Sequence, residues 1–92
     1  MKKQVNKWKA CINVVLKESV LDPQGETIKH ALHSLGYKQV DSVRIGKFIE
    51  VVFSSPSEQQ AKDKVSGMCK KLLVNSIIEK ASFKINKIKD DR

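Results

Sequence analysis

The residues that could do chemistry in this chain gather between positions 18 and 33. They are three carboxylates spaced four apart, a serine and two histidines: Glu18, Asp22, Glu26, Ser19, His30 and His33. Such residue types serve acid–base and nucleophilic catalysis when a fold brings them together. However, no nucleophile elbow surrounds a serine, and Gly46-Lys47 lacks the rest of a phosphate-binding loop. We therefore predict no catalytic residue in this chain.

Metal binding is not predicted either. Cys11 and Cys69 stand far apart and belong to no Cys-x-x-Cys pair. His30 and His33 are close enough to share a metal, but no thiol or carboxylate completes a zinc ligand set around them. We expect both cysteines to be reduced structural residues, and we expect this chain to bind no metal or cofactor.

The segment Leu21-Asp22-Pro23-Gln24-Gly25 has the pattern of an unusual helix start. Asp22 can cap a helix by accepting backbone N–H bonds, and Pro23 suits the first helical position because it has no N–H. Gly25 then falls in the first turn, where glycine costs ~1 kcal/mol relative to alanine. The alternative is a glycine tolerated near a frayed end. We predict that these five residues contact a partner, and that Gly25→Ala keeps the fold but weakens assembly.

A second group of candidate interface residues follows at Arg44, Gly46 and Lys47. Two basic side chains that flank a glycine can project from one turn and bind a phosphate or a partner carboxylate. The alternative is an exposed hairpin with ordinary surface charges.

Periodicity places these residues on a small set of elements. Period-two alternation predicts four strands, over 8–16, 40–45, 47–53 and 81–86. Helical i, i+3, i+4, i+7 spacing predicts two helices. The first covers 23–35, and the second begins at Ser55-Pro56-Ser57-Glu58 and runs to Leu73. Gly36 is expected to end the first helix, and Ser55 is a possible N-cap of the second. The order β-α-β-β-α-β predicts an α/β (α+β) two-layer sandwich of ferredoxin-like type with an antiparallel sheet.

The strand expected over 47–53 has apolar residues on both faces. Three of them share one face, and Phe48 and Val52 share the other with Glu50 between them. Since two helices do not cover both faces of a sheet, another copy of the chain is the simplest cover. We therefore predict a homo-oligomer, at least a dimer, that associates through Phe48, Glu50 and Val52.

Length and charge limit the classes of function. The 92 residues fit a single domain, 1–92, with tails at 1–6 and 88–92 expected to fray. The net charge of +8 would suit nucleic acid, but the lysines are dispersed and the five aromatic residues do not interleave with glycine and basic residues. No apolar run could span a bilayer and no signal-peptide pattern is visible. We expect a cytoplasmic protein without nucleic-acid or membrane partners.

Four segments in this order resemble the PurS family, the small subunit of phosphoribosylformylglycinamidine synthase in purine biosynthesis. They are LKESVLDPQG at 16–25, ALHSLG at 31–36, VRIGKFIE at 43–50 and CKKLLVNSIIE at 69–79. The resemblance covers roughly residues 8 to 86, and the first and third segments together are specific for the family.

The resemblance implies a function that the residues alone do not. In this family the small subunit is a non-catalytic bridge that couples a glutaminase subunit to an ATP-dependent synthetase subunit. ATP, magnesium and glutamine then belong to the partner subunits, and an interface role for Arg44, Gly46 and Lys47 follows because their segment matches. Two alternatives from the residues are a nucleic-acid-binding module and a small-molecule regulatory domain that holds a ligand at the Asp22–Gly25 turn.

Overall fold

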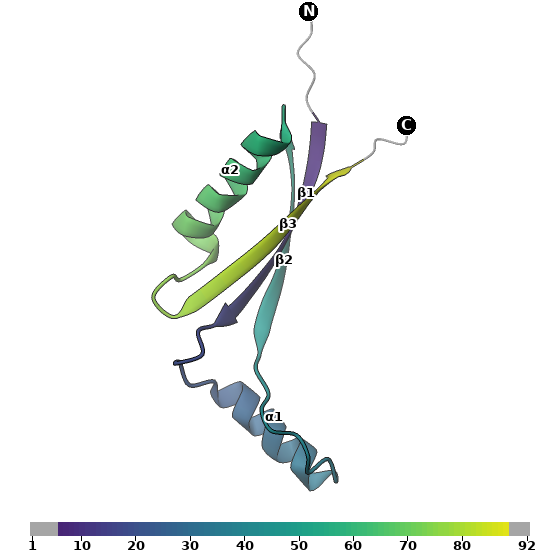
Figure 1. The fold of residues 1–92 in the computed structure, drawn as a ribbon, viewed down its shortest axis with the longest axis vertical. Helices are drawn as coiled ribbons and strands as arrows, with labels where there is room; N and C mark the ends of the chain where they lie inside the picture. Colours follow the sequence, from purple (N-terminus) through teal and green to yellow (C-terminus); the bar gives the residue numbers. More distant parts are fainter. Residues whose placement is uncertain (1–5, 89–92) are drawn as a thin grey trace, which may run out of the picture.

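A computed structural model describes residues 6–88 of the chain (Figure 1). The elements in order are β1 (Asn6–Leu16), α1 (Pro23–Ser34), β2 (Gly46–Ser55), α2 (Glu58–Met68), the π-helical η1 (Cys69–Leu73) and β3 (Glu79–Ile88). The three strands form one antiparallel sheet in the order β2-β1-β3. The predicted α+β class, with helix layered on an antiparallel sheet, is confirmed.

The hydrophobic core lies between the sheet and α2, which runs along one sheet face (Figure 1). Alternate residues of β1 point into it, and Ile12 is fully buried between Ile49 of β2 and Phe83 of β3. Val65 of α2 packs against these β1 side chains from the helix side of the core. Trp8 Nε1 donates a hydrogen bond of 3.0 Å to the Ser55 carbonyl oxygen. We call the sheet with α2 and η1 the body.

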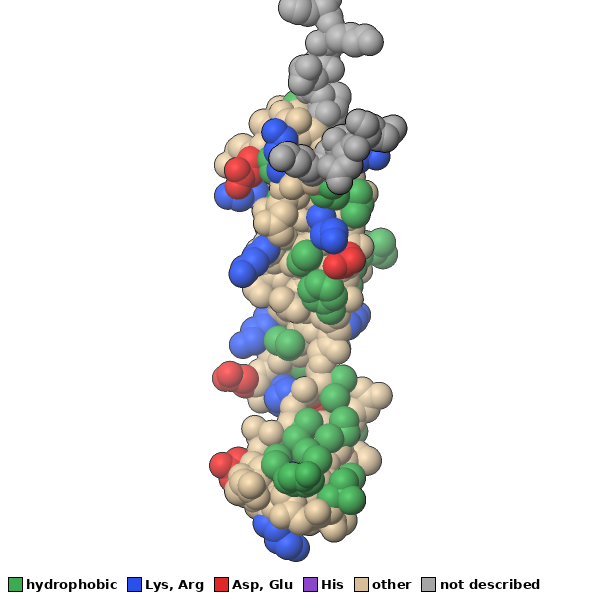
Figure 2. Space-filling view, turned by 90° about the vertical axis from the view of Figure 1, so that its right-hand side faces the viewer, with side chains coloured by type: hydrophobic (Ala, Val, Ile, Leu, Met, Phe, Trp, Pro, Cys, Tyr) green, Lys and Arg blue, Asp and Glu red, His purple; other side chains and the backbone are tan. Residues whose placement is uncertain are grey.

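Helix α1 lies beyond the end of the sheet and does not cover it (Figure 1). The apolar stripe of α1 with its C-cap Leu35 is partly open to solvent: Ile28 is 39% exposed and Leu35 is 73% exposed, and hydrophobic side chains gather on this end of the molecule (Figure 2). The Cα radius of gyration is 18.1 Å, whereas a compact chain of about 100 residues has about 13 Å. Within residues 6–88, one protomer therefore leaves apolar side chains of the α1 region uncovered.

The strand predicted over 40–45 is wrong. Residues 41–45 have no regular secondary structure, and the chain enters β2 without a hairpin. Gly46 pairs with Val15 as an ordinary strand residue and lacks the positive φ that a tight hairpin turn requires. The N–H of Ile45 donates to the carboxylate of Asp22 instead of a neighbouring strand. A distant side chain thus takes the hydrogen bond that the predicted strand needed.

Smaller corrections concern the ends of elements. The N-cap of α2 is Ser57, whose side chain accepts from the N–H of Gln60, because Ser55 is still the last residue of β2. Asn6 and Ile88 belong to strands, so the predicted tails are too long by one residue at each end, and 1–5 and 89–92 lie outside the described residues. Gly36, with φ of 105°, follows α1 as predicted. Neither α1 nor α2 is long and apolar enough to cross a membrane.

Candidate functional site

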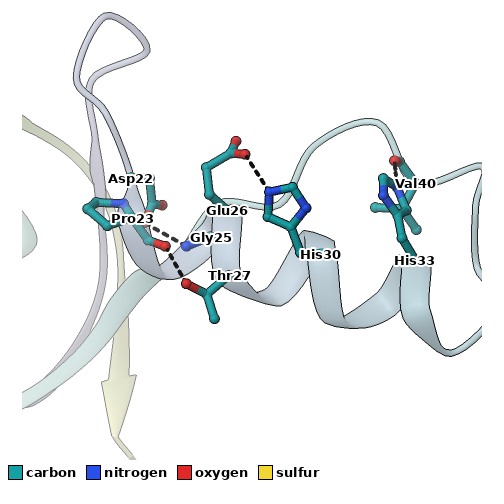
Figure 3. A network of polar contacts seen from close by, with 8 residues as sticks. All are labelled: Asp22, Pro23, Gly25, Glu26, Thr27, His30, His33 and Val40. Atoms are coloured by element: carbon teal, nitrogen blue, oxygen red, sulfur yellow. Dashed lines mark hydrogen bonds and ion pairs between the residues drawn. The ribbon is translucent and has the colours of Figure 1, made fainter.

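The predicted interface residues meet where α1 joins the sheet. Asp22, 5% exposed, caps α1 by accepting a 2.9 Å hydrogen bond from the N–H of Gly25 on Oδ1 (Figure 3). Its Oδ2 accepts a 2.7 Å bond from the N–H of Ile45. These two bonds, the Ile45 bond above all, and the charge of Arg44 lower the pKa of the Asp22 carboxyl below its ordinary value. Asp22 therefore acts as an ionised link between two segments distant in sequence.

The sequence predicted that a backbone segment packs closely against Gly25. In the structure this segment belongs to the same chain. Gly25 is buried, and a Cβ added to it would overlap the carbonyl oxygen of Val43 and lie 3.0 Å from the carbonyl carbon. The expectation that alanine fits here without disturbing the protomer is wrong. The helix propensity of alanine cannot offset an overlap with backbone atoms.

Asp22 bonds forward in the chain to Ile45, whereas Arg44 bonds back to residues 16–20. Its guanidinium donates to three backbone carbonyl oxygens at the end of β1 and just after it, at 2.9 Å to Lys17, 3.2 Å to Val20 and 3.3 Å to Leu16. A planar fork of donors suits such a set of acceptors. The side chain predicted to project toward a partner is thus bonded within its own chain, although it stays exposed.

Four of the predicted residues border one cleft of about 310 Å³. It lies between the start of α1 and the ends of the strands, and it is lined by Val14, Leu16, Asp22, Gln24, Ile45, Gly46, Lys47 and Glu79. Lys47 forms a 3.7 Å ion pair with Glu79 across this cleft, and Glu79 is a residue that no sequence signal indicated. A Cβ on Gly46 would come within 2.6 Å of the Val14 carbonyl oxygen, so the strands are closely packed there.

Predicted residues also lie on two separate exposed surfaces. Leu21, Pro23 and Gln24 are exposed at the start of α1. Phe48 and Val52, at 58% and 54% exposure, lie on the sheet face opposite α2. Glu50 stands between them in a 3.9 Å ion pair with Lys9.

Both histidines that the sequence offered for chemistry contact other groups of the described residues. His33 Nε2 lies 2.8 Å from the Val40 carbonyl oxygen, and His30 is paired with Glu26 at 3.9 Å (Figure 3). Burial raises the pKa of the Cys69 thiol, which disfavours the reactive thiolate. The described residues contain no group of three or more possible metal ligands. Because the Gly25 N–H already donates to Asp22, this N–H at the start of α1 is not available to bind a ligand.

The comparisons with known proteins agree on one family. The family model described as PurS, phosphoribosylformylglycinamidine (FGAM) synthase, matches residues 9–87. The phosphoribosylformylglycinamidine synthase subunit PurS of Bacillus subtilis is 43% identical over 81 residues, which is 88% of this chain and 95% of that protein. The PurS subunit of Methanocaldococcus jannaschii is 40% identical over 81 residues, covering 88% of this chain and 98% of that protein.

Solved structures match the fold over the same extent. The crystal structure of M. jannaschii PurS has a TM-score of 0.80 at 39% identity, and the match covers 89% of this chain and 99% of that one. A chain in the structure of PurLQS from Thermotoga maritima has a TM-score of 0.75 at 29% identity, covering 89% and 98% of the two chains.

Proposed function

Because the chain belongs to the PurS family of phosphoribosylformylglycinamidine synthase, we propose that it is the bridging subunit of that synthase in purine biosynthesis. It couples the glutaminase subunit to the ATP-dependent synthetase subunit and carries no catalytic group of its own. The observation that carries this proposal is the match of nearly the whole chain to relatives named as PurS subunits, one of them in a PurLQS structure. Catalysis, ATP, magnesium and glutamine belong to the partner subunits, and the complex works in the cytoplasm.

The shape of the protomer supports a bridging role. A bridge needs extended surfaces, and this chain measures 64 Å along its longest axis with α1 set apart from the body. Leu21 is 74% exposed at the start of α1, and Lys47 borders the cleft beside it. We propose that the junction of Leu21, Asp22, Pro23, Gln24, Gly25, Arg44, Gly46 and Lys47 meets a partner subunit through its exposed members.

Self-association accounts for the uncovered apolar surface. The stripe of α1 and the sheet face around Phe48 and Val52 both stay open in one protomer. Large exposed apolar patches are uncommon in monomeric proteins. We propose at least a homodimer, in which another copy covers one or both of these surfaces.

Reconstitution tests the bridging role. The three subunits are purified separately, and glutamine-dependent formation of the amidine product is measured with each subunit left out in turn. We expect the rate to fall to background without this chain, and the chain alone to hydrolyse neither glutamine nor ATP. A full glutamine-dependent rate from the two partners without this chain would contradict the proposal.

Sedimentation of the chain alone tests self-association separately. We expect an oligomer at micromolar concentration. A monomer at every concentration would contradict it, whatever the outcome of the reconstitution.

A further inference from the structure

Two connections determine the direction in which α1 leaves the body. They are residues 17–22, which follow β1, and residues 35–45, which lead back to β2. Since α1 does not lie on the sheet (Figure 1), no packed face of the helix fixes its angle. Whatever holds the two connections to each other therefore also holds the helix.

Asp22 and Arg44 join these connections reciprocally. Asp22, from the first connection, accepts the Ile45 N–H at the end of the second at 2.7 Å. Arg44, from the second, donates to the Leu16, Lys17 and Val20 carbonyl oxygens at 2.9–3.3 Å. We propose that Asp22 and Arg44 are positioning residues that fix α1 against the body, so that its apolar stripe is held ready for a second copy of the chain. We call this pair the α1 clamp.

The geometry favours a rigid clamp over a loose tether. Asp22 is nearly fully buried, and each of its carboxylate oxygens has its own backbone donor. Gly25 lies against the Val43 carbonyl, so the first turn of α1 is packed on the second connection without space for a Cβ. Holding a binding element in its bound orientation raises affinity because less entropy is lost on association.

The clamp is separate from the hydrophobic core. The buried apolar side chains belong to β1 and α2, and neither clamp residue is among them. Loss of the clamp should therefore free α1 while the body stays folded. This inference rests on the proposed self-association, because it assigns the α1 stripe to another copy.

The test uses two variants and one matched control in the full chain. Asp22→Ser keeps an acceptor for the helix cap, since serine is a good N-cap, but its single, shorter-reaching oxygen replaces only one of the two carboxylate oxygens that accept from Gly25 and Ile45. Arg44→Gln replaces the guanidinium and its several N–H donors by one shorter amide, at a side chain that is exposed to solvent. Ser57→Ala is the control, because it removes the N-cap bond of α2 to Gln60 and leaves the clamp intact.

Three readouts separate orientation, assembly and folding. Spin labels on the exposed positions Ser34 of α1 and Ser66 of α2, in a Cys11→Ser and Cys69→Ala background diluted with unlabelled chain, report the angle of α1 within one protomer. Sedimentation reports the dissociation constant of the oligomer. The emission of Trp8, the single tryptophan, reports the body.

We expect both clamp variants to broaden the label distance distribution and to raise the dissociation constant about tenfold or more, with unchanged Trp8 emission. Ser57→Ala should change neither distance nor dissociation constant. An unchanged distribution, unchanged assembly, or loss of native Trp8 emission in both variants would overturn the inference. If the unaltered chain is monomeric, the self-association proposal fails by itself, and the label distances still decide whether the clamp orients α1.

Discussion

The body and helix α1 differ in where their apolar side chains go. In the body, Ile12 and Val65 are fully buried between a sheet and a helix of the same chain. In α1 and its C-cap, a similar stripe stays partly in solvent, with Ile28 at 39% and the C-cap Leu35 at 73% exposure. The same helical periodicity thus supports a core in one region and an open surface in the other. An amphipathic pattern predicts that a face will be covered, but it does not say which chain covers it.

The largest expected effect contrasts the two regions directly. Ile12→Ala leaves a cavity in the body and should lower the free energy of unfolding by ~2–5 kcal/mol. Leu35→Ala should change the unfolding of the dilute protomer by less than ~0.5 kcal/mol, because its side chain is already exposed. Denaturant titration followed by Trp8 emission measures both. A large loss in the dilute Leu35 variant would mean that α1 packs on its own body after all.

Two glycines offer the next contrast. Gly25→Ala forces a Cβ against the Val43 carbonyl and should destabilise the junction by ~1–3 kcal/mol. Gly67→Ala is the matched control, since nothing lies within 4 Å of its added Cβ in α2, and it should stabilise the body by up to ~1 kcal/mol. We expect the melting temperature to fall for Gly25→Ala and to rise for Gly67→Ala. A higher melting temperature for Gly25→Ala would show that the junction can open to admit the methyl group.

Acid should loosen the junction before it affects the core. A carboxyl whose pKa is lowered by folding stabilises the folded state above its ordinary pKa, here 3.8, and this contribution is lost as the pH falls through the lowered value. The charge of Arg44 contributes to the lowered pKa of Asp22, and Lys47 and Glu79 line the same cleft. The urea midpoints of the unaltered chain and Asp22→Ser should therefore converge as the pH is lowered below 3.8. A gap that stays constant down to pH 2 would argue against an ionised Asp22.

The smallest expected effect distinguishes a structural charge from an interface charge. Lys47→Gln removes a half-exposed ion pair with Glu79 and should cost at most ~1 kcal/mol of stability. If Lys47 meets a partner subunit, reconstitution should require a higher concentration of this variant, whereas Lys62→Gln, which removes an exposed ion pair with Glu58 on α2, should not. Equal behaviour of the two variants in reconstitution would remove Lys47 from the interface.

The errors in the predicted fold have a common physical origin. Apolar alternation over 40–45 was compatible with a strand, yet Ile45 gives its N–H to Asp22 and Arg44 binds the segment after β1. Each interaction joins residues more than twenty positions apart, and periodicity carries no information about such pairs. Glu79 was missed for the same reason, because its proximity to Lys47 depends on a sheet order that places β1 between them.

The sequence by itself determined the local features of this protein. It determined the buried alternation of β1, the cap and first turn of α1, the left-handed Gly36 and the family, because each depends on neighbouring residues or on segments read in order. It also indicated that some backbone approaches Gly25. Only the tertiary structure decided that this backbone is Val43, that Asp22 and Arg44 join the two connections of α1, and that α1 stands clear of its own sheet. Those outcomes depend on which distant groups satisfy one buried carboxylate and one guanidinium, and hydrogen bonds of this kind form only when the chain has folded.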